Sequence, residues 1–389
     1  HRPVARAVAA RCFSGETFHE GDVLSWGTGQ QGQLGHSEEK VLLPRRVAVL
    51  PEAVVDIACG ASTTAAVGAS GALYTWGTCE FGSLGHGVGV TECPRPAIVE
   101  ALMGIPIASV SVGTNHMAAL SADGDVFTWG WGGSFFGGCG GLGHGDTTDQ
   151  PRPALVEALG EDGHKVTQVS CGGKHTLALT SDGTVLGWGA GDYGRLGNGR
   201  RSQKVPMPLE LLQDNGVRAV QVAAGGSFSL VVDDSGAMWS FGRNDQSQLG
   251  LGANLTMDIN SMEEFPVENR KFEGHAVLAV AAGKQHALAI TDDGGVYYWG
   301  NRQFIEPHRL TLLDGADIVQ VAGGENFCAA LSAGGELWTW GRGLTSGALG
   351  HGKSRGEKHP RKVEALSELS VSRVSLGAKH AAVILGAAP

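Results

Sequence analysis

The sequence predicts an all-β fold, a seven-bladed β-propeller, from three features: a repeated aromatic-glycine pair, a second motif in phase with it, and chain ends that complete each other. The pair recurs at intervals of 41 to 59 residues in a chain of 389 residues. Its seven copies are Trp26-Gly27, Trp76-Gly77, Trp129-Gly130, Trp188-Gly189, Phe241-Gly242, Trp299-Gly300 and Trp340-Gly341. A period of about 40 to 50 residues with a Trp-containing mark and many glycines is typical of propeller blades.

The second motif, Gly-x-x-His or a variant, alternates with the aromatic-glycine pair. Its first and last residues are Gly60/Thr63, Gly113/His116, Gly172/His175, Gly225/Phe228, Gly283/His286, Gly324/Phe327 and Gly377/His380. Short apolar segments flank it, such as 166–171 and 176–179 around the third copy. A glycine five residues before each aromatic, as in Asp123-Gly124 and Asp182-Gly183, predicts a two-residue hairpin turn, because glycine tolerates positive φ. Each unit is therefore expected to be a small antiparallel sheet.

A third motif, Leu-Gly, follows the aromatic by eight residues in four units and at a shifted distance in two others. The copies are Leu34-Gly35, Leu84-Gly85, Leu142-Gly143, Leu196-Gly197, Leu249-Gly250 and Leu349-Gly350. The unit of Trp299 lacks this motif and is also the shortest. We expect its outer strand to be curtailed.

The two ends of the chain decide between an open array and a closed ring. The first aromatic, Trp26, has its turn glycine at Gly21 but no preceding Gly-x-x-His strand, and the last such strand, 377–385, has no aromatic-glycine strand after it. Pairing of residues 22–27 with 379–385 would complete a seventh blade and satisfy the edges that an open array exposes. The predicted organisation is a basic extension at 1–19, a propeller at 20–386 and a tail at 387–389.

The order aromatic-Gly, Leu-Gly-His-Gly and Val-x-x-Gly-x-x-His resembles the repeats of the regulator of chromosome condensation (RCC1) family over residues 20–386. The resemblance implies a seven-bladed propeller, and it leaves the function open, since members serve as nucleotide exchange factors, light sensors and binding modules. Light-sensing members carry Trp directly after the repeat glycine. Here those positions hold Ala61, Thr114, Gly173, Gly226, Lys284, Glu325 and Ala378. A tryptophan-based photoreceptor is therefore not expected.

Composition narrows the range of partners. The net charge of −10 argues against a general electrostatic grip on nucleic acid, so we do not expect direct nucleic-acid binding. No apolar run approaches the 18 or so residues of a membrane helix, and we expect no membrane insertion. The seven cysteines form no Cys-x-x-Cys pair, and we interpret them as packed side chains in a reducing compartment.

The histidines and two glycine-rich stretches could suggest a catalytic, metal or cofactor site. The histidines fall at two repeat positions, one holding His116, His175, His286 and His380 and the other His36, His86, His144 and His351. Residues related by sevenfold symmetry do not converge, so we interpret them as structural hydrogen-bonding groups within each blade. Segments 27–32 and 189–194 spell the dinucleotide fingerprint, yet a Leu-Gly motif follows instead of a helix. We expect no catalytic, cofactor or metal site and no enzymatic activity.

Departures from the symmetry are candidate partner contacts. An insertion at 130–141 in the third unit carries Trp131, Phe135 and Phe136, which would form an exposed aromatic contact or cover the surface of the ring itself. Exchange-factor members of the family carry a wedge at a similar position, but this loop has no charged residue to compete for a phosphate and magnesium site. A long segment at 254–275 carries Met257, Met262 and Phe265, usable for a partner or for packing.

The first residues suggest a location. Residues 1–14 contain Arg2, Arg6 and Arg11, four alanines and no acid, the composition of a mitochondrial transit segment. The alternative is a short basic tail on a cytosolic or nuclear protein. These features together predict a non-enzymatic protein-interaction platform, bound to a large mitochondrial assembly such as the ribosome or a respiratory complex. The alternative function is nucleotide exchange on a small GTPase.

Overall fold

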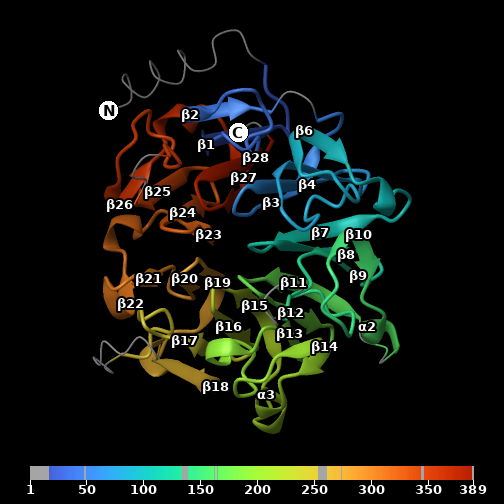
Figure 1. Cartoon of the computed structure of the whole chain (residues 1–389). Helices are drawn as coiled ribbons and strands as arrows, with labels where there is room; N and C mark the ends of the chain where they lie inside the picture. Colours follow the sequence, from blue (N-terminus) through green and yellow to red (C-terminus); the bar gives the residue numbers. More distant parts are fainter. Residues whose placement is uncertain are drawn as a thin grey trace.

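The structure, a computed structural model, describes residues 17–47, 50–133, 139–161, 163, 165–252, 261–272, 274–342 and 346–387. In these residues 28 strands form seven four-stranded antiparallel sheets around a central channel (Figure 1). The predicted all-β, seven-bladed propeller is confirmed. One-turn helices lie on the connections between sheets: η1 (Glu100–Leu102), α2 (Glu157–Glu161), α3 (Glu210–Asp214), η3 (Arg270–Phe272), η4 (Thr311–Leu313) and η5 (Glu364–Leu366).

Each sheet has an inner, a second, a third and an outer strand, counted from the channel. The inner strands are β3 (Val54–Cys59), β7 (Ile107–Val112), β11 (Val166–Cys171), β15 (Ala219–Ala224), β19 (Val277–Ala282), β23 (Ile318–Gly323) and β27 (Val371–Leu376). The second strands are β4 (Thr63–Gly68), β8 (His116–Ser121), β12 (His175–Thr180), β16 (Phe228–Asp233), β20 (His286–Thr291), β24 (Phe327–Ser332) and β28 (His380–Leu385). The third strands are β1 (Val23–Thr28), β5 (Leu73–Thr78), β9 (Val126–Gly130), β13 (Val185–Gly189), β17 (Met238–Arg243), β21 (Val296–Gly300) and β25 (Leu337–Gly341). The outer strands are β2 (Lys40–Arg46), β6 (Glu92–Ile98), β10 (Gln150–Leu155), β14 (Gln203–Pro208), β18 (Met262–Glu268), β22 (Phe304–Arg309) and β26 (Glu357–Lys362).

Both ends of the chain build the sheet that closes the ring. Its strand order is β2-β1-β28-β27, and β1 pairs with β28 from Val23↔Ile384 to Gly27↔His380. The predicted closure is therefore confirmed. The sheet edges are then the inner strands, which face the channel, and the outer strands on the rim. Each outer strand contains proline, which cannot donate to a further strand. The prolines are Pro44, Pro94, Pro96, Pro151, Pro153, Pro206, Pro208, Pro266, Pro307 and Pro360.

The hairpins between second and third strands differ from the two-residue turns that the sequence predicted. Between β8 and β9, Ser121 N donates to Asp125 O (2.8 Å) and Gly124 N donates to Ser121 O (3.1 Å), with Gly124 at φ 95°. This is a three-residue loop ending in a left-handed glycine. The glycine was predicted correctly and the loop length was not, because Asp-Gly fits both turn types.

The third-strand aromatics pack between neighbouring sheets. Trp188 is fully buried, and its Nε1 donates to Gly141 O in the preceding sheet (2.8 Å), just before a Leu-Gly pair. The Leu-Gly turn thus supplies the carbonyl that accepts the indole N–H of the next sheet. The same bond is made by Trp26, Trp76, Trp129 and Trp299.

The unit that lacks Leu-Gly departs from this scheme. Its outer strand β22 spans six residues, so the expected curtailed strand is wrong. What is shortened is the connection from β21 to β22, residues 301–303, which leaves no room for a Leu-Gly turn. An aromatic cluster occupies this region: Phe304 lies edge-on to Tyr298 (6.0 Å) and stacks on His308 (4.0 Å).

Candidate protein-interaction face

The repeat histidines form hydrogen bonds within the propeller. His116 Nε2 lies 2.9 Å from Thr176 Oγ1, and Thr176 Oγ1 donates to Gly141 O (2.7 Å). This bond joins two sheets, as do the bonds of His175 and His380, so the expectation of bonding within a blade is wrong for these three. It is correct for His286, whose Nδ1 lies 3.1 Å from Asn301 Nδ2 of the same blade. It is also correct for the other set, as in His86 Nε2 and Thr75 Oγ1 of one sheet (3.0 Å).

Burial fixes the protonation of these groups. It lowers the pKa of His116, His286 and His380 to about 4, so each is a neutral imidazole near pH 7. Burial likewise raises the pKa of the Cys59 and Cys171 thiols to about 12, which keeps them out of thiolate chemistry. Neutral, enclosed side chains of this kind serve packing.

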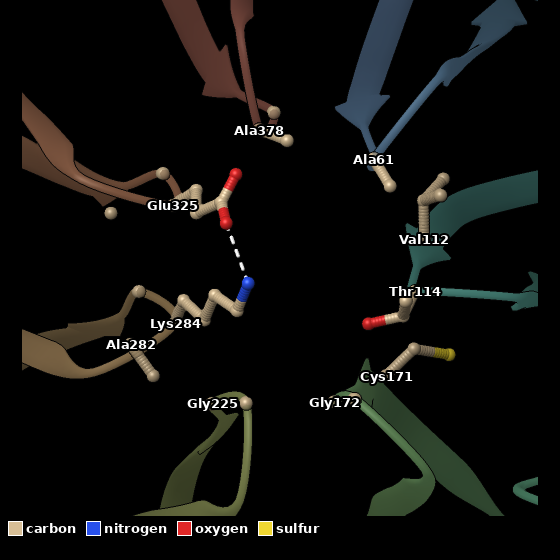
Figure 2. Close-up of a pocket in the computed structure, with 18 of the residues that line it drawn as sticks. Ala61, Val112, Thr114, Cys171, Gly172, Gly225, Ala282, Lys284, Glu325 and Ala378 are labelled. Atoms are coloured by element: carbon tan, nitrogen blue, oxygen red, sulfur yellow. Dashed lines mark hydrogen bonds and ion pairs between the residues drawn. The ribbon is translucent and has the colours of Figure 1, made fainter.

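The central channel opens among the Gly-x-x-His loops (Figure 2). This end forms a cavity of about 260 Å³, lined by the ends of the inner strands and by small loop residues such as Ala61, Thr114 and Ala378. Two lining residues are charged: Lys284 Nζ and Glu325 Oε1 form an ion pair at 2.5 Å, on one side of the mouth. The lining offers little polar chemistry beyond this pair.

Trp131 lies against the neighbouring sheet instead of standing in solvent. It is 7% exposed, its ring centroid is 6.4 Å from that of Phe81, and Lys174 Nζ lies 5.2 Å above its ring. Phe81 reaches it from a backbone with φ 61°. Of the two alternatives for Trp131, this burial agrees with the one in which the side chain covers the surface of the ring itself. Phe135 and Phe136 lie outside the described residues.

The second candidate segment lies elsewhere. Met262 is half-buried at the start of β18, and Phe265 on the same strand is 52% exposed. The strand belongs to the sheet β15–β18, whereas Trp131 follows β9 of the sheet β7–β10, so the structure does not bring these candidates together. Met257 lies outside the described residues.

Sequence reasoning missed a second aromatic–cation contact between sheets. Tyr193 lies in η2 (Asp192–Gly194), with φ 63°, and occupies the position that Phe81 has two sheets earlier. Arg243, at the repeat position of Trp131, lies 4.7 Å from the Tyr193 ring centroid, and Arg195 lies 5.7 Å from it. The available signal was Arg195 itself, since other units carry Gln, Ser, Gly or Ala directly before Leu-Gly.

One group in the described chain has the composition of a metal site: His275, Asp292 and Asp293, all on the surface. Asp293 already accepts from Thr291 Oγ1 (2.6 Å) and pairs with Arg309 (2.5 Å). Exposed acids with other partners of this kind do not define a metal centre. Among the helices described, none is both long and apolar enough to cross a membrane.

The geometry defines a closed seven-bladed propeller whose repeat residues serve the junctions between sheets. A family model for the RCC1-like domain matches residues 3–302, and RCC1 repeat models match residues 318–347 and 334–384. The chain belongs to the RCC1-like family.

The curated relatives of this chain are proteins of different functional classes. The chain is 36% identical to the ultraviolet-B receptor UVR8 and 37% identical to the mitochondrial RCC1 domain-containing protein RUG3, both of Arabidopsis thaliana, over 75% and 70% of its length. It is 33% identical to the human E3 ubiquitin-protein ligase HERC2 over 92% of its length. The chain spans 63% of UVR8, 61% of RUG3 and 8% of HERC2.

Solved structures agree on the fold. Human WBSCR16 matches with a TM-score of 0.79 at 22% identity, covering 94% of this chain and 98% of that one. Prp20p of Saccharomyces cerevisiae, described with its binding to Gsp1p and histones, matches with a TM-score of 0.82 at 21% identity, covering 95% and 92%.

Proposed function

We propose that this protein is a non-enzymatic protein-interaction platform that works in mitochondria as part of, or bound to, a large assembly. The observation that carries the proposal is the use of the repeat histidines. In the described residues, His116, His175 and His380 bridge neighbouring sheets through Thr or Ser hydroxyls at 2.9 Å, which supports a structural role for them. The contacts between sheets also hold Trp131, Tyr193 and Arg243, residue types that are enriched in protein interfaces.

The mitochondrial part of the proposal rests on two supports of different kinds. Residues 1–14 have the composition of a transit segment, with Arg2, Arg6 and Arg11 and no acid. RUG3, at 37% identity, is a mitochondrial member of the same family. The crosslinking experiment below distinguishes a ribosomal from a respiratory assembly.

Crosslinking inside intact mitochondria, followed by capture of the tagged full chain and mass spectrometry, tests the platform. We expect subunits of one ribosomal or respiratory assembly to be enriched. Phe135→Ala combined with Phe136→Ala should reduce that enrichment, because aromatic anchors dominate interface energies. Val88→Ala is the matched control, since Val88 is 90% exposed and lies on another loop. If the wild-type chain, the double variant and Val88→Ala capture the assembly equally, the insertion is not the contact surface.

The alternative function is nucleotide exchange on a small GTPase. It is favoured by the insertion at 130–141, which follows Trp129-Gly130 at the position where exchange-factor relatives carry their wedge. Release of labelled GDP from candidate mitochondrial GTPases measures it directly. An acceleration of tenfold or more, equivalent to about 1.4 kcal/mol in the barrier, would favour exchange over the platform.

Targeting has its own test. Residues 1–30 fused to a fluorescent reporter should direct it to mitochondria, and changing Arg2, Arg6 and Arg11 to Glu should abolish import, because transit segments are basic. Fluorescence microscopy with a mitochondrial marker reads the result. A diffuse reporter in the unmutated fusion would contradict the mitochondrial assignment.

A further inference from the structure

The two ends of the propeller differ in charge. One end, the Gly-x-x-His face, carries the Gly-x-x-His loops and the connections from third to outer strands. The opposite end, the hairpin face, carries the hairpins between second and third strands and the connections from outer strands to the next inner strands, with residues 17–22 in place of one hairpin. Among the side chains that the structure describes in these connections, the hairpin face has 18 acidic groups and four Lys or Arg, whereas the Gly-x-x-His face has eight acidic groups and ten Lys or Arg. The hairpin face is therefore the negative end of the molecule.

Turn chemistry explains only part of this excess of acids. Asp182 and Asp293 accept hydrogen bonds from the hydroxyls of Thr180 and Thr291, two residues earlier in the chain, as aspartate commonly does in turns. Such turns do not exclude Lys or Arg from the neighbouring positions, and the connections at the other face contain them. The shortage of cations is therefore a property of this surface and not of its turns.

The inner strands expose side chains at the same end. The second residue of each inner strand is skipped in the pairing with the second strand, as Leu278 is between Val277↔Thr291 and Ala279↔Ile290. Such a bulge turns a side chain out of the regular alternation of the strand. In all seven sheets this residue is exposed. It is Val55, Val220, Leu278 or Val319 in four sheets, with 52% to 62% exposure, and Ala108, Thr167 or Ser372 in the others.

The bulge does not require an apolar residue, because Thr167 and Ser372 occupy it in two sheets. Val220, Leu278 and Val319 nevertheless lie on β15, β19 and β23, which follow one another around the channel (Figure 1). We call these three residues the apolar arc. Single exposed aliphatic residues are ordinary, but a run of them on three neighbouring strands at one end of a ring is typical of an interaction surface.

The charge around the apolar arc decides between the possible occupants. A second copy of the chain that presented the same face would bring two negative surfaces together. Nucleic acid and anionic lipid surfaces carry the same sign of charge and would also be repelled. A protein segment with both Lys or Arg and aliphatic side chains complements the charge and the apolar arc at the same time.

We propose that the hairpin face binds a cationic amphipathic segment of a partner protein. Its aliphatic side chains cover the apolar arc, and its Lys and Arg side chains meet exposed carboxylates of the same sheets, such as Asp234, Asp292 and Asp317. The proposal rests on the platform function and adds the face and the chemistry of a partner. This surface is separate from the insertion at 130–141, which follows β9 at the opposite end of the propeller.

The direct test is binding of a synthetic peptide to the purified full chain. The probe is a fluorescein-labelled peptide of Lys and Leu, with Leu at positions i, i+3, i+4 and i+7 of one helix face, and the reference is a scrambled peptide of the same composition. Fluorescence anisotropy should show saturable binding that weakens as salt is added, and weaker binding of the scrambled peptide. A chain that does not bind the amphipathic peptide, or that binds both peptides equally, would overturn the proposal.

Variants assign the binding to the face. Leu278→Ser combined with Val319→Thr introduces residue types already present at the bulge and should weaken peptide binding at least tenfold. Val88→Ser is the matched control, because Val88 is an exposed aliphatic residue on the Gly-x-x-His face, and it should leave binding unchanged. Equal binding by the wild-type chain and the double variant would contradict the proposed surface.

A second pair of variants tests the charge and does not alter the apolar arc. Asp292→Asn combined with Asp317→Asn should weaken binding at least threefold and reduce its salt dependence, and asparagine suits the left-handed backbone of Asp317 (φ 55°). Glu39→Gln combined with Glu80→Gln removes two exposed acids from the other face and should have no effect. If Leu278→Ser with Val319→Thr does not fold, this comparison decides. Self-association of the chain, or binding of phosphatidylserine vesicles or duplex DNA, that is lost in Leu278→Ser with Val319→Thr would identify another occupant and overturn the proposal.

Crosslinking in intact mitochondria separates this proposal from the platform function. If the wild-type chain captures an assembly but does not bind the peptide, the platform stands and the hairpin face is not its cationic docking surface. If the chain binds the peptide through the apolar arc but captures no assembly, the hairpin face stands and the platform function is wrong. Loss of both peptide binding and capture in Leu278→Ser with Val319→Thr supports both.

Discussion

Two junctions between neighbouring sheets show what the repeat residues contribute. At the junction of β7–β10 with β11–β14, Gly141 O accepts from both Thr176 Oγ1 (2.7 Å) and Trp188 Nε1 (2.8 Å), and His116 Nε2 completes the network with Thr176. We call this the complete junction. All three side chains are essentially fully buried, and among their polar atoms only His116 Nδ1 has no partner in the described residues.

The junction of β19–β22 with β23–β26, which we call the incomplete junction, has none of these bonds. Cys328 replaces the threonine, and the preceding unit has no Leu-Gly turn to provide a carbonyl. Of the described atoms enclosed without a partner, two belong here: His286 Nε2 and Trp340 Nε1. Trp340 is nevertheless 4% exposed and packs with Tyr298, Leu288 and Cys328 in one apolar cluster.

The comparison separates two roles of the repeat. Apolar packing of the third-strand aromatic holds neighbouring sheets together at both junctions, whereas the polar network is present at one. An enclosed donor without a partner costs about 1 to 3 kcal/mol, so the incomplete junction should be the weaker seam of the ring. The closed ring, with β1 paired to β28, keeps that seam from opening at an end of the chain.

The largest expected effect is acid destabilisation. His116, His286 and His380 have a pKa of about 4 in the fold against an ordinary 6.5, and burial holds the pKa of His175 well below that value. The unfolded chain therefore binds more protons than the folded chain in this range. The contribution of these histidines to the free energy of unfolding should be complete above pH 6.5 and should be lost as the pH falls from 6.5 to 4. Each histidine contributes up to about 1.4 kcal/mol per pH unit. Urea unfolding at several pH values measures the slope.

Histidine variants show how much each junction contributes to the pH dependence of the free energy of unfolding. His286→Phe should reduce it by one proton at a smaller cost near pH 8 than His116→Phe. It gives up only the half-buried contact of Asn301 Nδ2 with His286 Nδ1 (3.1 Å), and Phe228 and Phe327 already occupy this repeat position. His116→Phe should reduce the slope equally but lower stability near pH 8, since Thr176 loses a partner. Equal stability of the two variants at pH 8 would contradict the distinction between the junctions.

An effect of intermediate size is expected when the tryptophans of the two junctions are replaced by phenylalanine. Trp188→Phe removes a donor to Gly141 O, whereas Trp340→Phe removes an unpaired N–H from the interior. Phe241 shows that phenylalanine fits this repeat position. We expect Trp188→Phe to lower the free energy of unfolding by about 1 to 3 kcal/mol more than Trp340→Phe. Denaturant midpoints compare them, and equal losses would show that packing alone matters.

Much of this architecture could be predicted from the sequence, because the repeat encodes it. The phase of Trp26 against His380 was enough to predict ring closure, and the missing Leu-Gly in the unit of Trp299 marked the irregular blade. Hydrogen bonds between sheets could not be predicted, since His116 and Thr176 are 60 residues apart and their approach depends on how the blades rotate against one another.

The contacts of Trp131 and Tyr193 between sheets were harder to predict for a physical reason. Trp131 is buried because Phe81, held at φ 61°, reaches it from the preceding sheet, and a left-handed aromatic residue is not evident from residue types. The Arg195–Tyr193–Arg243 contact has the same cause, with Tyr193 at φ 63°. A comparison of Arg195 with Gln33 and Gln248 could have marked it, since a charge replaces amides there.

The smallest expected effect is a gain in the free energy of unfolding from a substitution at the incomplete junction. Cys328→Thr should place a hydroxyl beside His286 Nε2, as Thr176 does for His116 at 2.9 Å. Cys328→Val is the matched control, because valine has the shape of threonine without the hydroxyl. The Thr variant should exceed the Val variant by about 0.5 to 1.5 kcal/mol in free energy of unfolding, the value of one hydrogen bond. The gain should not exceed this range, because the Leu-Gly carbonyl that Thr176 also uses is missing here. A Thr variant no more stable than the Val variant would show that His286 cannot reach the hydroxyl, and the unpaired nitrogen would then reflect sheet spacing instead of the missing threonine.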